Sequence, residues 1–241
     1  MGKPIGVLGC SGTVGKNVTE KLLRNGYAVL GGQRSGNCLF LTRTGFQFCR
    51  MDMENPAQLL AFCQACSVVV NCTAPFSRYG AKVARAAGAS GAIYIDGADF
   101  LLQEKELPPE GTYVVGSGYV PGIAEYLAAQ IARTELDIPE QIILYQGGTE
   151  LCSESAFVDI VMNGTASGYA DACYAEKICP LHGNLKEFHQ LPDFPHPVLL
   201  KPYLTRSLLE MRERVGWKRM CWYNAYENMQ FLQMLFQAYR C

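Results

Sequence analysis

The sequence predicts an α/β protein built on a Rossmann-type doubly wound parallel sheet, followed by a smaller α+β domain. Three observations predict this fold. A glycine-rich turn follows the first apolar run of the 241-residue chain. Apolar runs then alternate with helix-like segments, as they do in parallel α/β sheets. The alternation stops further along the chain, so we expect a first domain over 1–122 and a second over 123–241.

The expected elements follow the apolar runs in order. In the first domain, strands are expected at 4–9, 27–32, 46–49, 67–72, 92–96 and 112–116, and helices at 13–25, 56–65 and 79–89. A further helix is expected to start at Pro121 and to continue over 125–133. In the second domain, 141–146 favours a strand, and 153–174, 204–214 and 217–239 favour helices.

Residues 4–15 form the most informative segment, a strand that ends in a glycine-rich turn and leads into a helix. Gly9 permits a tight turn, Gly12 permits close approach of a pyrophosphate, and Gly15 permits the helix to pack closely on the sheet. The helix N-terminus offers N–H groups and a positive dipole end to phosphates. A purely structural turn is the alternative. The pattern predicts dinucleotide binding, with the pyrophosphate held by Gly9, Ser11, Gly12, Thr13, Val14 and Gly15.

The end of the second strand indicates which dinucleotide to expect. An NAD site usually has an acidic residue there, which binds the ribose 2′-hydroxyl. No Asp or Glu occurs between Tyr27 and Phe48, and Arg34 and Ser35 stand at the strand end instead. A guanidinium and a hydroxyl suit a 2′-phosphate, so we expect NADP(H). A solvent-exposed loop arginine without this role is the alternative.

Two further loops lie where cofactor contacts are expected. Asp52 and Met53 follow the third strand and are placed near the adenine by their position. The loop after the fourth strand lies at the carboxyl edge of the sheet, where ligands bind in this architecture. We expect this loop beside the nicotinamide ribose, through Cys72, Thr73, Ala74 and Pro75.

Composition limits the classes of partner. The chain is 49% hydrophobic and 18% charged, with a net charge of −1, which gives no reason to expect nucleic acid or a membrane surface. It enters a strand at its start and has no apolar run long enough to span a bilayer, so a cytoplasmic protein is expected. The eleven cysteines are scattered, which favours buried free thiols in a reducing compartment.

Two groups of residues contain the side chains that metal or redox sites use. Cys63 and Cys66 form a single CxxC at the end of an expected helix, where core packing is the favoured interpretation. A looser group has spacings that match no compact zinc module, and prolines interrupt it. It contains Cys173, Cys179, His182, His189 and His196. No metal site is therefore expected.

These segments together resemble the saccharopine dehydrogenase (saccharopine reductase-like) NADP-binding family. The resembling segments are 9–15, 32–35, 70–80, 94–96 and 118–122, with a weaker match at 163–168. The most specific segment is Val70-Asn-Cys-Thr-Ala-Pro-Phe-Ser-Arg-Tyr-Gly80. The resemblance implies a Rossmann domain, an α+β substrate and dimerisation domain, and a homodimer. It also implies NADP(H)-dependent hydride transfer to or from an imine of an amino-acid-like substrate. Family members are usually much longer than this chain.

Imine reduction requires placement of the hydride, a proton for nitrogen and positive charge for the substrate carboxylates. Asp96 ends the fifth strand at the carboxyl edge, and a turn carboxylate is its alternative role. Tyr79 and Tyr119 are candidates for a phenol near the hydride, with packing as the alternative. Arg78, Lys201 and Arg206 are unranked candidates for carboxylate binding.

Two other functions stay open. The short second domain and the lack of a clear acid–base pair favour a non-catalytic NADP(H)-binding sensor or interaction protein. A nucleotide-sugar or epimerase-type enzyme shares the glycine turn. The Tyr-x-x-x-Lys pair of short-chain dehydrogenases is missing near residue 150, because Tyr145 is followed four residues later by Thr149.

Overall fold

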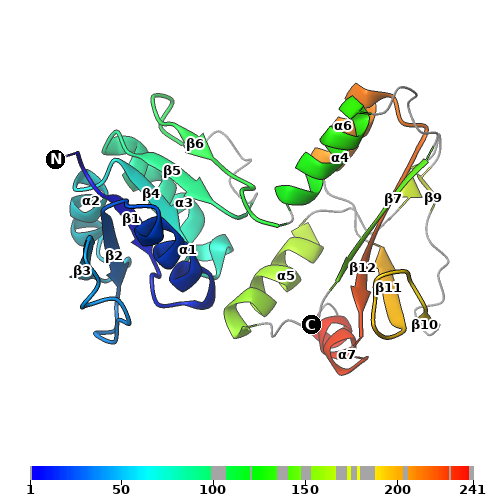
Figure 1. Cartoon of the computed structure of the whole chain (residues 1–241), viewed down its shortest axis with the longest axis horizontal. Helices are drawn as coiled ribbons and strands as arrows, with labels where there is room; N and C mark the ends of the chain where they lie inside the picture. Colours follow the sequence, from blue (N-terminus) through cyan, green and yellow to red (C-terminus); the bar gives the residue numbers. More distant parts are fainter. Residues whose placement is uncertain are drawn as a thin grey trace. The chain divides into compact units, whose positions relative to one another are not determined.

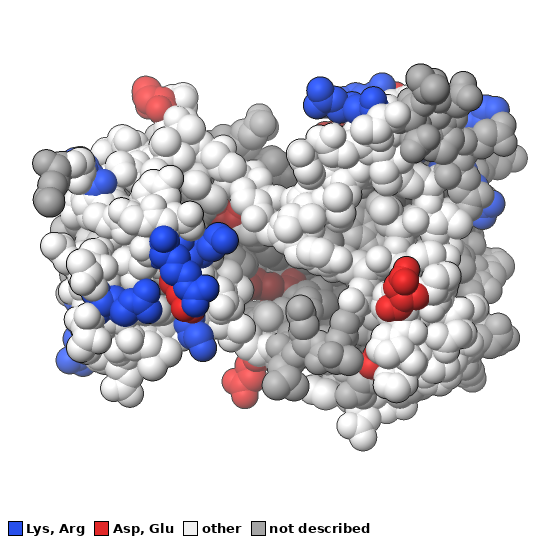
Figure 2. All heavy atoms as spheres, viewed as in Figure 1, with Lys and Arg blue, Asp and Glu red and all other residues white. Residues whose placement is uncertain are grey.

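The computed structural model describes residues 2–98, 107–119, 121–134, 141–147, 153–166, 173–174, 178–179, 188–202, 206–227 and 229–238. The chain divides into two compact units, Met1–Ile123 and Ala124–Cys241. Figure 2 shows basic and acidic side chains in small groups on a mostly uncharged visible face, in keeping with the net charge of −1. Among the helices that can be described, none combines the length and the apolar character needed to cross a membrane.

The first unit is built on a parallel sheet with the strand order β3-β2-β1-β4-β5-β6 (Figure 1). Its strands are β1 (Ile5–Leu8), β2 (Val29–Gln33), β3 (Phe46–Arg50), β4 (Val68–Asn71), β5 (Ile93–Asp96) and β6 (Tyr113–Val114). Because β1 lies between β2 and β4, the order reverses there, which creates the topological switch point at which doubly wound folds bind ligands. The predicted fold class is confirmed.

Helices cover both faces of this sheet. On one face, α1 (Thr13–Arg24) contributes Val18, Leu22 and Leu23 to a cluster with Val7 and Val29. On the other face, α2 (Pro56–Gln64) and α3 (Phe76–Ala89) pack against a cluster around Leu8, Val69 and Tyr94. The consecutive residues Val7 and Leu8 therefore pack into hydrophobic clusters on opposite faces of the sheet, as the alternation of side chains along a strand requires.

Local chemistry sets the ends of these helices. Asn55 caps α2, since its side chain accepts hydrogen bonds from the N–H groups of Ala57 and Gln58, and Pro56 supplies the first helical residue. The helix expected from residue 79 begins at Phe76, directly after the extended Pro75. Pro121 precedes α4 (Ile123–Thr134) instead of lying within its first turn.

The second unit contains a mixed sheet with the order β10-β11-β12-β8-β9, and β7 pairs with β12 in parallel. Its strands are β7 (Gln141–Gly147), β8 (Cys173–Tyr174), β9 (Ile178–Cys179), β10 (Phe188–His189), β11 (Val198–Pro202) and β12 (Arg219–Tyr226). Its remaining helices are α5 (Glu154–Ala166), α6 (Arg206–Val215) and α7 (Met229–Ala238). The strand expected at 141–146 is present as β7.

Two expected helices need correction. The helix expected over 217–239 is wrong at its start, because 219–226 form the central strand β12 and only 229–238 are helical. Met220, Cys221 and Trp222 are all buried, so the strand is covered on both faces and lacks alternation. The helix expected over 153–174 ends at Ala166, and 173–174 belong to β8. Residues 167–172 lie outside the described part.

The cysteines of the first unit lie in or beside its core. Cys63 and Cys66 are buried against α2 and the sheet, and burial raises the pKa of the Cys63 thiol to about 12 and that of Cys66 to about 11. Both are therefore held as neutral thiols, which fits the core-packing interpretation. Cys221 differs, because it is disulfide-bonded, so the expectation of free thiols throughout is wrong there.

Candidate functional site

The glycine-rich turn between β1 and α1 brings three backbone segments close together. Gly9 has a φ of +75°, a left-handed conformation that side-chain-bearing residues rarely adopt. A Cβ at Gly15 would clash with the carbonyl oxygen of Gly9 and would lie 2.8 Å from its carbonyl carbon. A Cβ at Gly9 would in turn lie 3.0 Å from the carbonyl oxygen of Cys72, after β4. The turn therefore depends on glycine at these two positions.

The N-terminus of α1 faces this turn without a side-chain cap. Its N-cap residue is Gly12, which has no side chain to accept a hydrogen bond, and no acidic residue lies in the first turn. Thr13 and Val14 are exposed there. The first N–H groups of a helix have no intrahelical partner, so an anion placed here gains several hydrogen bonds and the favourable helix dipole.

Gln33, at the end of β2, ties the turn to the loop that follows β2. Its Oε1 accepts a hydrogen bond from the Ser11 N–H at 3.2 Å, and its Nε2 donates to the carbonyl oxygens of Ser35 at 3.0 Å and Asn37 at 2.6 Å. The Ser11 hydroxyl donates to the same Asn37 carbonyl at 3.3 Å. Ser11 and Ser35 are thus held on either side of Gln33, to which the sequence analysis assigns no role of its own.

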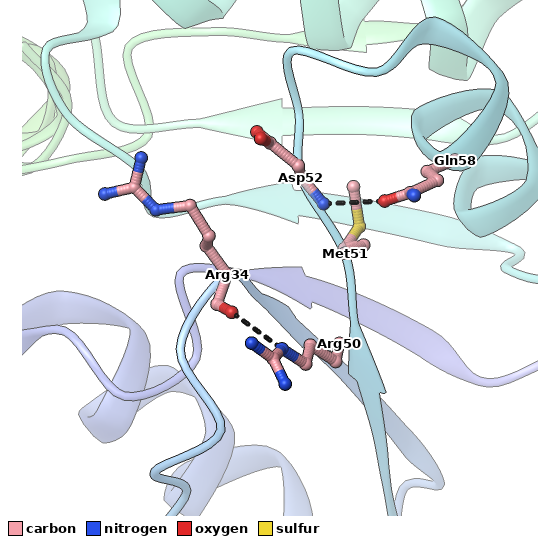
Figure 3. A pocket seen from close by; sticks show the side chains of 5 residues that line it. All are labelled: Arg34, Arg50, Met51, Asp52 and Gln58. Carbon is pink, nitrogen blue, oxygen red and sulfur yellow. Dashed lines mark hydrogen bonds between the residues drawn. The ribbon is translucent and has the colours of Figure 1, made fainter.

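A pocket of about 330 Å³ lies beside this loop and is lined by Arg34, Arg50, Met51, Asp52 and Gln58 (Figure 3). The main chain of Asp52 is fixed by its N–H, which donates to Gln58 Oε1 at 2.8 Å. Its Oδ1 accepts from the Glu54 N–H at 3.0 Å. The predicted residues Arg34 and Asp52 are therefore brought into one pocket. Met53 is not among the lining residues; it packs against the core on the α2 and α3 face, and Met51 lines the pocket.

The loop after β4 is fixed by the buried side chain of Asn71. Asn71 Oδ1 accepts hydrogen bonds from the Thr73 hydroxyl at 2.6 Å and the Thr73 N–H at 3.2 Å. The peptide bond between Ala74 and Pro75 is cis. Burial, with a smaller contribution from Cys10, raises the pKa of the Cys72 thiol to about 12. Cys72 is therefore a neutral packing residue beside the glycine turn.

Asp96 belongs to the same network and is 3% exposed. Its Oδ2 accepts from the Tyr94 hydroxyl at 2.6 Å, and its Oδ1 accepts from the Ala98 N–H at 3.0 Å. The Tyr94 hydroxyl also accepts from Asn71 Nδ2 at 3.1 Å. Burial and the neighbouring Asp96 carboxyl raise the pKa of Tyr94 well above its usual value. The chain Thr73–Asn71–Tyr94–Asp96 thus joins the ends of β4 and β5, and Asp96 has the geometry of a turn carboxylate.

The two candidate tyrosines lie in different surroundings. Tyr79 is in the first turn of α3, where the Arg78 guanidinium lies 5.2 Å and the Lys82 amine 5.9 Å from its ring centre. Both cations pair with Glu54; Arg78 does so at 2.8 Å. The hydrogen bond from Lys82, followed by that from Arg78, lowers the pKa of Glu54. Arg78, a candidate for carboxylate binding, therefore already has an acidic partner.

Tyr119 is 59% exposed in the loop that follows β6. This loop packs against the end of β5, because a Cβ at Gly118 would lie 2.7 Å from the carbonyl oxygen of Gly97. The Ser117 N–H donates to the Asp96 carbonyl oxygen at 2.9 Å. Tyr119 is thereby carried to the carboxyl edge of the sheet with its side chain in solvent. The side chains of Lys201, Arg206 and His182 lie outside the described part of the chain.

The residues at this edge fit a dinucleotide phosphate with a 2′-phosphate. The uncapped helix N-terminus suits the pyrophosphate, and the cradle at Gly9 and Gly15 is filled by backbone alone. The basic side chains of the pocket after β2 suit the extra phosphate. Arg34 and the glycines are predicted from the sequence, whereas Gln33, Arg50, Asn71 and Tyr94 are not, because each makes a contact with a residue at least 16 positions away in the chain. Among the described residues, no group of three His, Cys, Asp or Glu side chains is placed to hold a metal ion.

Three solved structures show what this chain is similar to, and the first of them agrees with the fold described above. A saccharopine dehydrogenase (L-Glu forming) from Saccharomyces cerevisiae, in its apo histidine-tagged form, superposes with a TM-score of 0.70 at 17% identity. The match covers 94% of this chain and 56% of that chain, so the present chain spans little more than half the length of the yeast protein. The TrkA-N domain of the inner membrane protein ybaL from Escherichia coli is 18% identical, with a TM-score of 0.41 over 56% of this chain and 98% of that chain. Vestitone reductase from alfalfa is 21% identical, with a TM-score of 0.32 over 38% and 34% of the two chains.

A comparison with curated protein sequences finds no match. The model of the saccharopine dehydrogenase NADP binding domain matches residues 5–135, which is more than half of the chain and contains the glycine turn, the pocket after β2 and the Asn71 network. The chain carries an NADP(H)-binding domain, and it belongs to the saccharopine dehydrogenase NADP-binding family.

Proposed function

We propose that this chain is an NADP(H)-dependent oxidoreductase that transfers hydride to or from the carbon–nitrogen bond of an amino-acid-derived imine. The observation that carries the NADP(H) part of the proposal is the layout of the carboxyl edge. The uncapped N-terminus of α1, the pocket at Arg34 and the loop fixed by Asn71 occupy the three places that a dinucleotide phosphate needs. The likeness to a yeast protein described as a saccharopine dehydrogenase supports this choice of substrate class.

NADP(H), when bound, supplies the hydride carrier. The chain's own residues divide the remaining work. The N–H groups at the start of α1 hold the pyrophosphate, and Arg34 and Ser35 hold the 2′-phosphate. Asn71 and Tyr94 keep the Thr73 loop and the end of β5 in fixed positions beside the nicotinamide ribose.

Tyr119 is the better of the two tyrosines for transferring a proton to or from the substrate nitrogen. Its phenol is in solvent at the carboxyl edge, whereas the Tyr79 ring lies against Arg78 and Lys82. Asp96 acts as a positioning residue in this proposal, because both of its oxygens accept hydrogen bonds from the protein.

The first experiment measures binding and turnover separately. NADPH and NADH are titrated into the wild type and into Arg34→Ala, followed by the fluorescence of the reduced nicotinamide. We expect NADPH to bind more tightly than NADH and Arg34→Ala to reduce that preference. The wild type is then incubated with saccharopine and NADP⁺, while nicotinamide reduction and L-glutamate release are followed. Tight NADPH binding without turnover of saccharopine or of related secondary amines would overturn the catalytic proposal.

A non-catalytic NADP(H) sensor is the second candidate, and two contacts favour it. Asp96 has both oxygens engaged within the protein, and Arg78 is paired with Glu54, so neither is poised for a substrate. For a sensor, Tyr119→Phe would change no chemical rate, because no turnover exists. For the enzyme, Tyr119→Phe should lower kcat with little effect on NADPH affinity.

A further inference from the structure

The pocket beside β2 contains a second guanidinium, that of Arg50, which the sequence did not single out. Arg50 is the last residue of β3 and lies directly beside Gln33, the last residue of β2, in the parallel register. The two strands therefore end together, and the Arg50 side chain starts from the same edge as the Arg34 loop. This edge is where Rossmann folds contact the 2′ position of the adenosine ribose.

A hydrogen bond fixes the Arg50 side chain at that place. Its Nε donates to the Arg34 carbonyl oxygen at 3.3 Å. Figure 3 shows the Arg50 guanidinium against the main chain of Arg34, while the side chain of Arg34 extends away from it. Because Nε makes this contact, the two terminal NH₂ groups stay available for an oxyanion. Arg50 is thus held in place, and Arg34, exposed to solvent, can move onto a ligand from the other side.

The charge balance of the pocket calls for an anion. Within the part of the chain that the structure describes, neither Arg34 nor Arg50 lies within ion-pair distance of a carboxylate. Asp52 is the acidic residue of the pocket, and its Oδ1 is turned to the Glu54 N–H. Two cations against one anion leave a net positive charge at a site open to solvent. A dianionic phosphate monoester matches both the charge and the fork geometry of two guanidiniums.

We propose that Arg50 is a specificity-determining residue that binds the 2′-phosphate of NADP(H) directly, together with Arg34. Arg50 supplies the fixed donor group, and Arg34 closes over the phosphate from the opposite side. Discrimination against NAD(H) then comes from two arginines on neighbouring strands. The proposal rests on the NADP(H)-binding assignment and is independent of whether the chain catalyses a reaction.

The test uses ligands that differ only in the 2′-phosphate. Affinities for NADPH, NADH, 2′,5′-ADP and 5′-AMP are measured by calorimetry for the wild type, Arg50→Ala and Arg43→Ala. Arg43→Ala is the control, because it removes the same charge at a residue that precedes the start of β3 and does not line the pocket. We expect Arg50→Ala to weaken NADPH and 2′,5′-ADP by about tenfold or more, the loss expected for a charge-assisted hydrogen bond. NADH, 5′-AMP and all ligands of Arg43→Ala should be unaffected.

A double-mutant cycle separates direct contact from support of the Arg34 loop. If Arg50 binds the phosphate itself, Arg50→Ala should weaken 2′,5′-ADP further in the Arg34→Ala background. If it only positions Arg34, the second substitution should have no effect there. Equal weakening of NADPH and NADH, or an unchanged preference for NADPH, would overturn the proposal. A wild type that does not prefer NADPH would instead overturn the expected role of this pocket, which keeps the two failures distinct.

Discussion

Removing one buried hydroxyl should show how strongly the network at the carboxyl edge holds the first unit together. Tyr94→Phe deletes an oxygen that donates to Asp96 Oδ2 and accepts from Asn71 Nδ2. Tyr94 is fully buried, so no water replaces either partner. A buried polar group that loses its partner costs about 1–3 kcal/mol, and a charged one costs more. Because the Asn71 amide and the Asp96 carboxylate each lose this hydrogen bond, we expect the first unit to lose about 3–5 kcal/mol of stability.

Tyr113→Phe provides a matched control on the neighbouring strand. Its hydroxyl donates to the Pro108 carbonyl oxygen at 2.9 Å, and its ring lies 6.4 Å from that of Tyr94. This side chain is only partly buried, so water can reach the freed carbonyl, and the cost should stay near 1 kcal/mol.

Urea unfolding followed by hydrogen-exchange mass spectrometry measures both variants. The method resolves β4 and β5 directly, whereas the fluorescence of Trp217 and Trp222 reports on the second unit. Protection of the β4 and β5 amides should fall much further in Tyr94→Phe than in Tyr113→Phe. Equal effects of the two substitutions would refute the idea that Asp96 and Asn71 depend on the Tyr94 hydroxyl.

Two further predictions concern the glycine turn and the buried thiols. Gly15→Ala should lower the melting temperature and abolish NADPH binding, because the overpacking cost of about 1–3 kcal/mol outweighs the gain of at most about 1 kcal/mol from alanine in a helix. Gly2→Ala, which has open space around it, should change neither measurement. The folded-state pKa values of Cys63 and Cys66 are raised from 9.0 to about 12 and about 11. Unfolded thiols therefore lose their protons first as the pH rises, so urea midpoints should fall from about pH 9 upward and stay flat between about pH 7 and pH 8. A midpoint that is constant up to about pH 10.5 would contradict the assignment of these thiols to the core.

Much of the first unit could be predicted from sequence because its local signals agree with each other. A Cβ at Gly9 or Gly15 would lie 3.0 Å or less from backbone atoms, so the glycine pattern in the sequence and the close backbone approach in the structure have one cause. The start of helix α2 can be predicted from Asn55 and Pro56, because Asn55 is a favoured capping residue and Pro56 a favoured first helical residue. Each of these features depends on residues near in sequence, and for that reason a single sequence reveals them.

The second unit was harder because its signals are ambiguous. Met220 to Tyr226 is apolar enough for a buried helix or a central strand, and a short apolar run does not distinguish the two by periodicity. The segment is a strand in the structure because β7 and β11 pair with it on either side. Enrichment in aromatic residues, with Trp222, Tyr223 and Tyr226 in eight positions, was the signal that favoured a strand.

The roles of side chains in the site could not be predicted either, because they also depend on contacts that form only in the fold. Asp96 was a reasonable catalytic candidate by its position, yet Tyr94 and Ala98, neighbours two residues away on either side, take up its oxygens. Arg50 gave no signal, because its approach to Arg34 depends on the register of β2 and β3. Sequence position identifies the edge at which a residue lies, and only the fold determines what its side chain contacts.

Cofactor binding and hydride transfer make different demands on the side chains, so they need separate tests in this protein. In the proposed site, backbone groups at the start of α1 bind the pyrophosphate and two arginines add the preference for NADP(H), so the fold of the first unit supplies cofactor binding with few side chains. Hydride transfer to a substrate requires in addition a proton donor and cations that face the substrate. Of the groups described here, Asp96 and Arg78 are engaged by the protein itself, and Tyr119 is in solvent at the edge. A protein that kept the fold and lost its chemistry would therefore bind NADPH as tightly as an enzyme. Turnover, and the effect of Tyr119→Phe on it, is the measurement that decides between the two candidate functions.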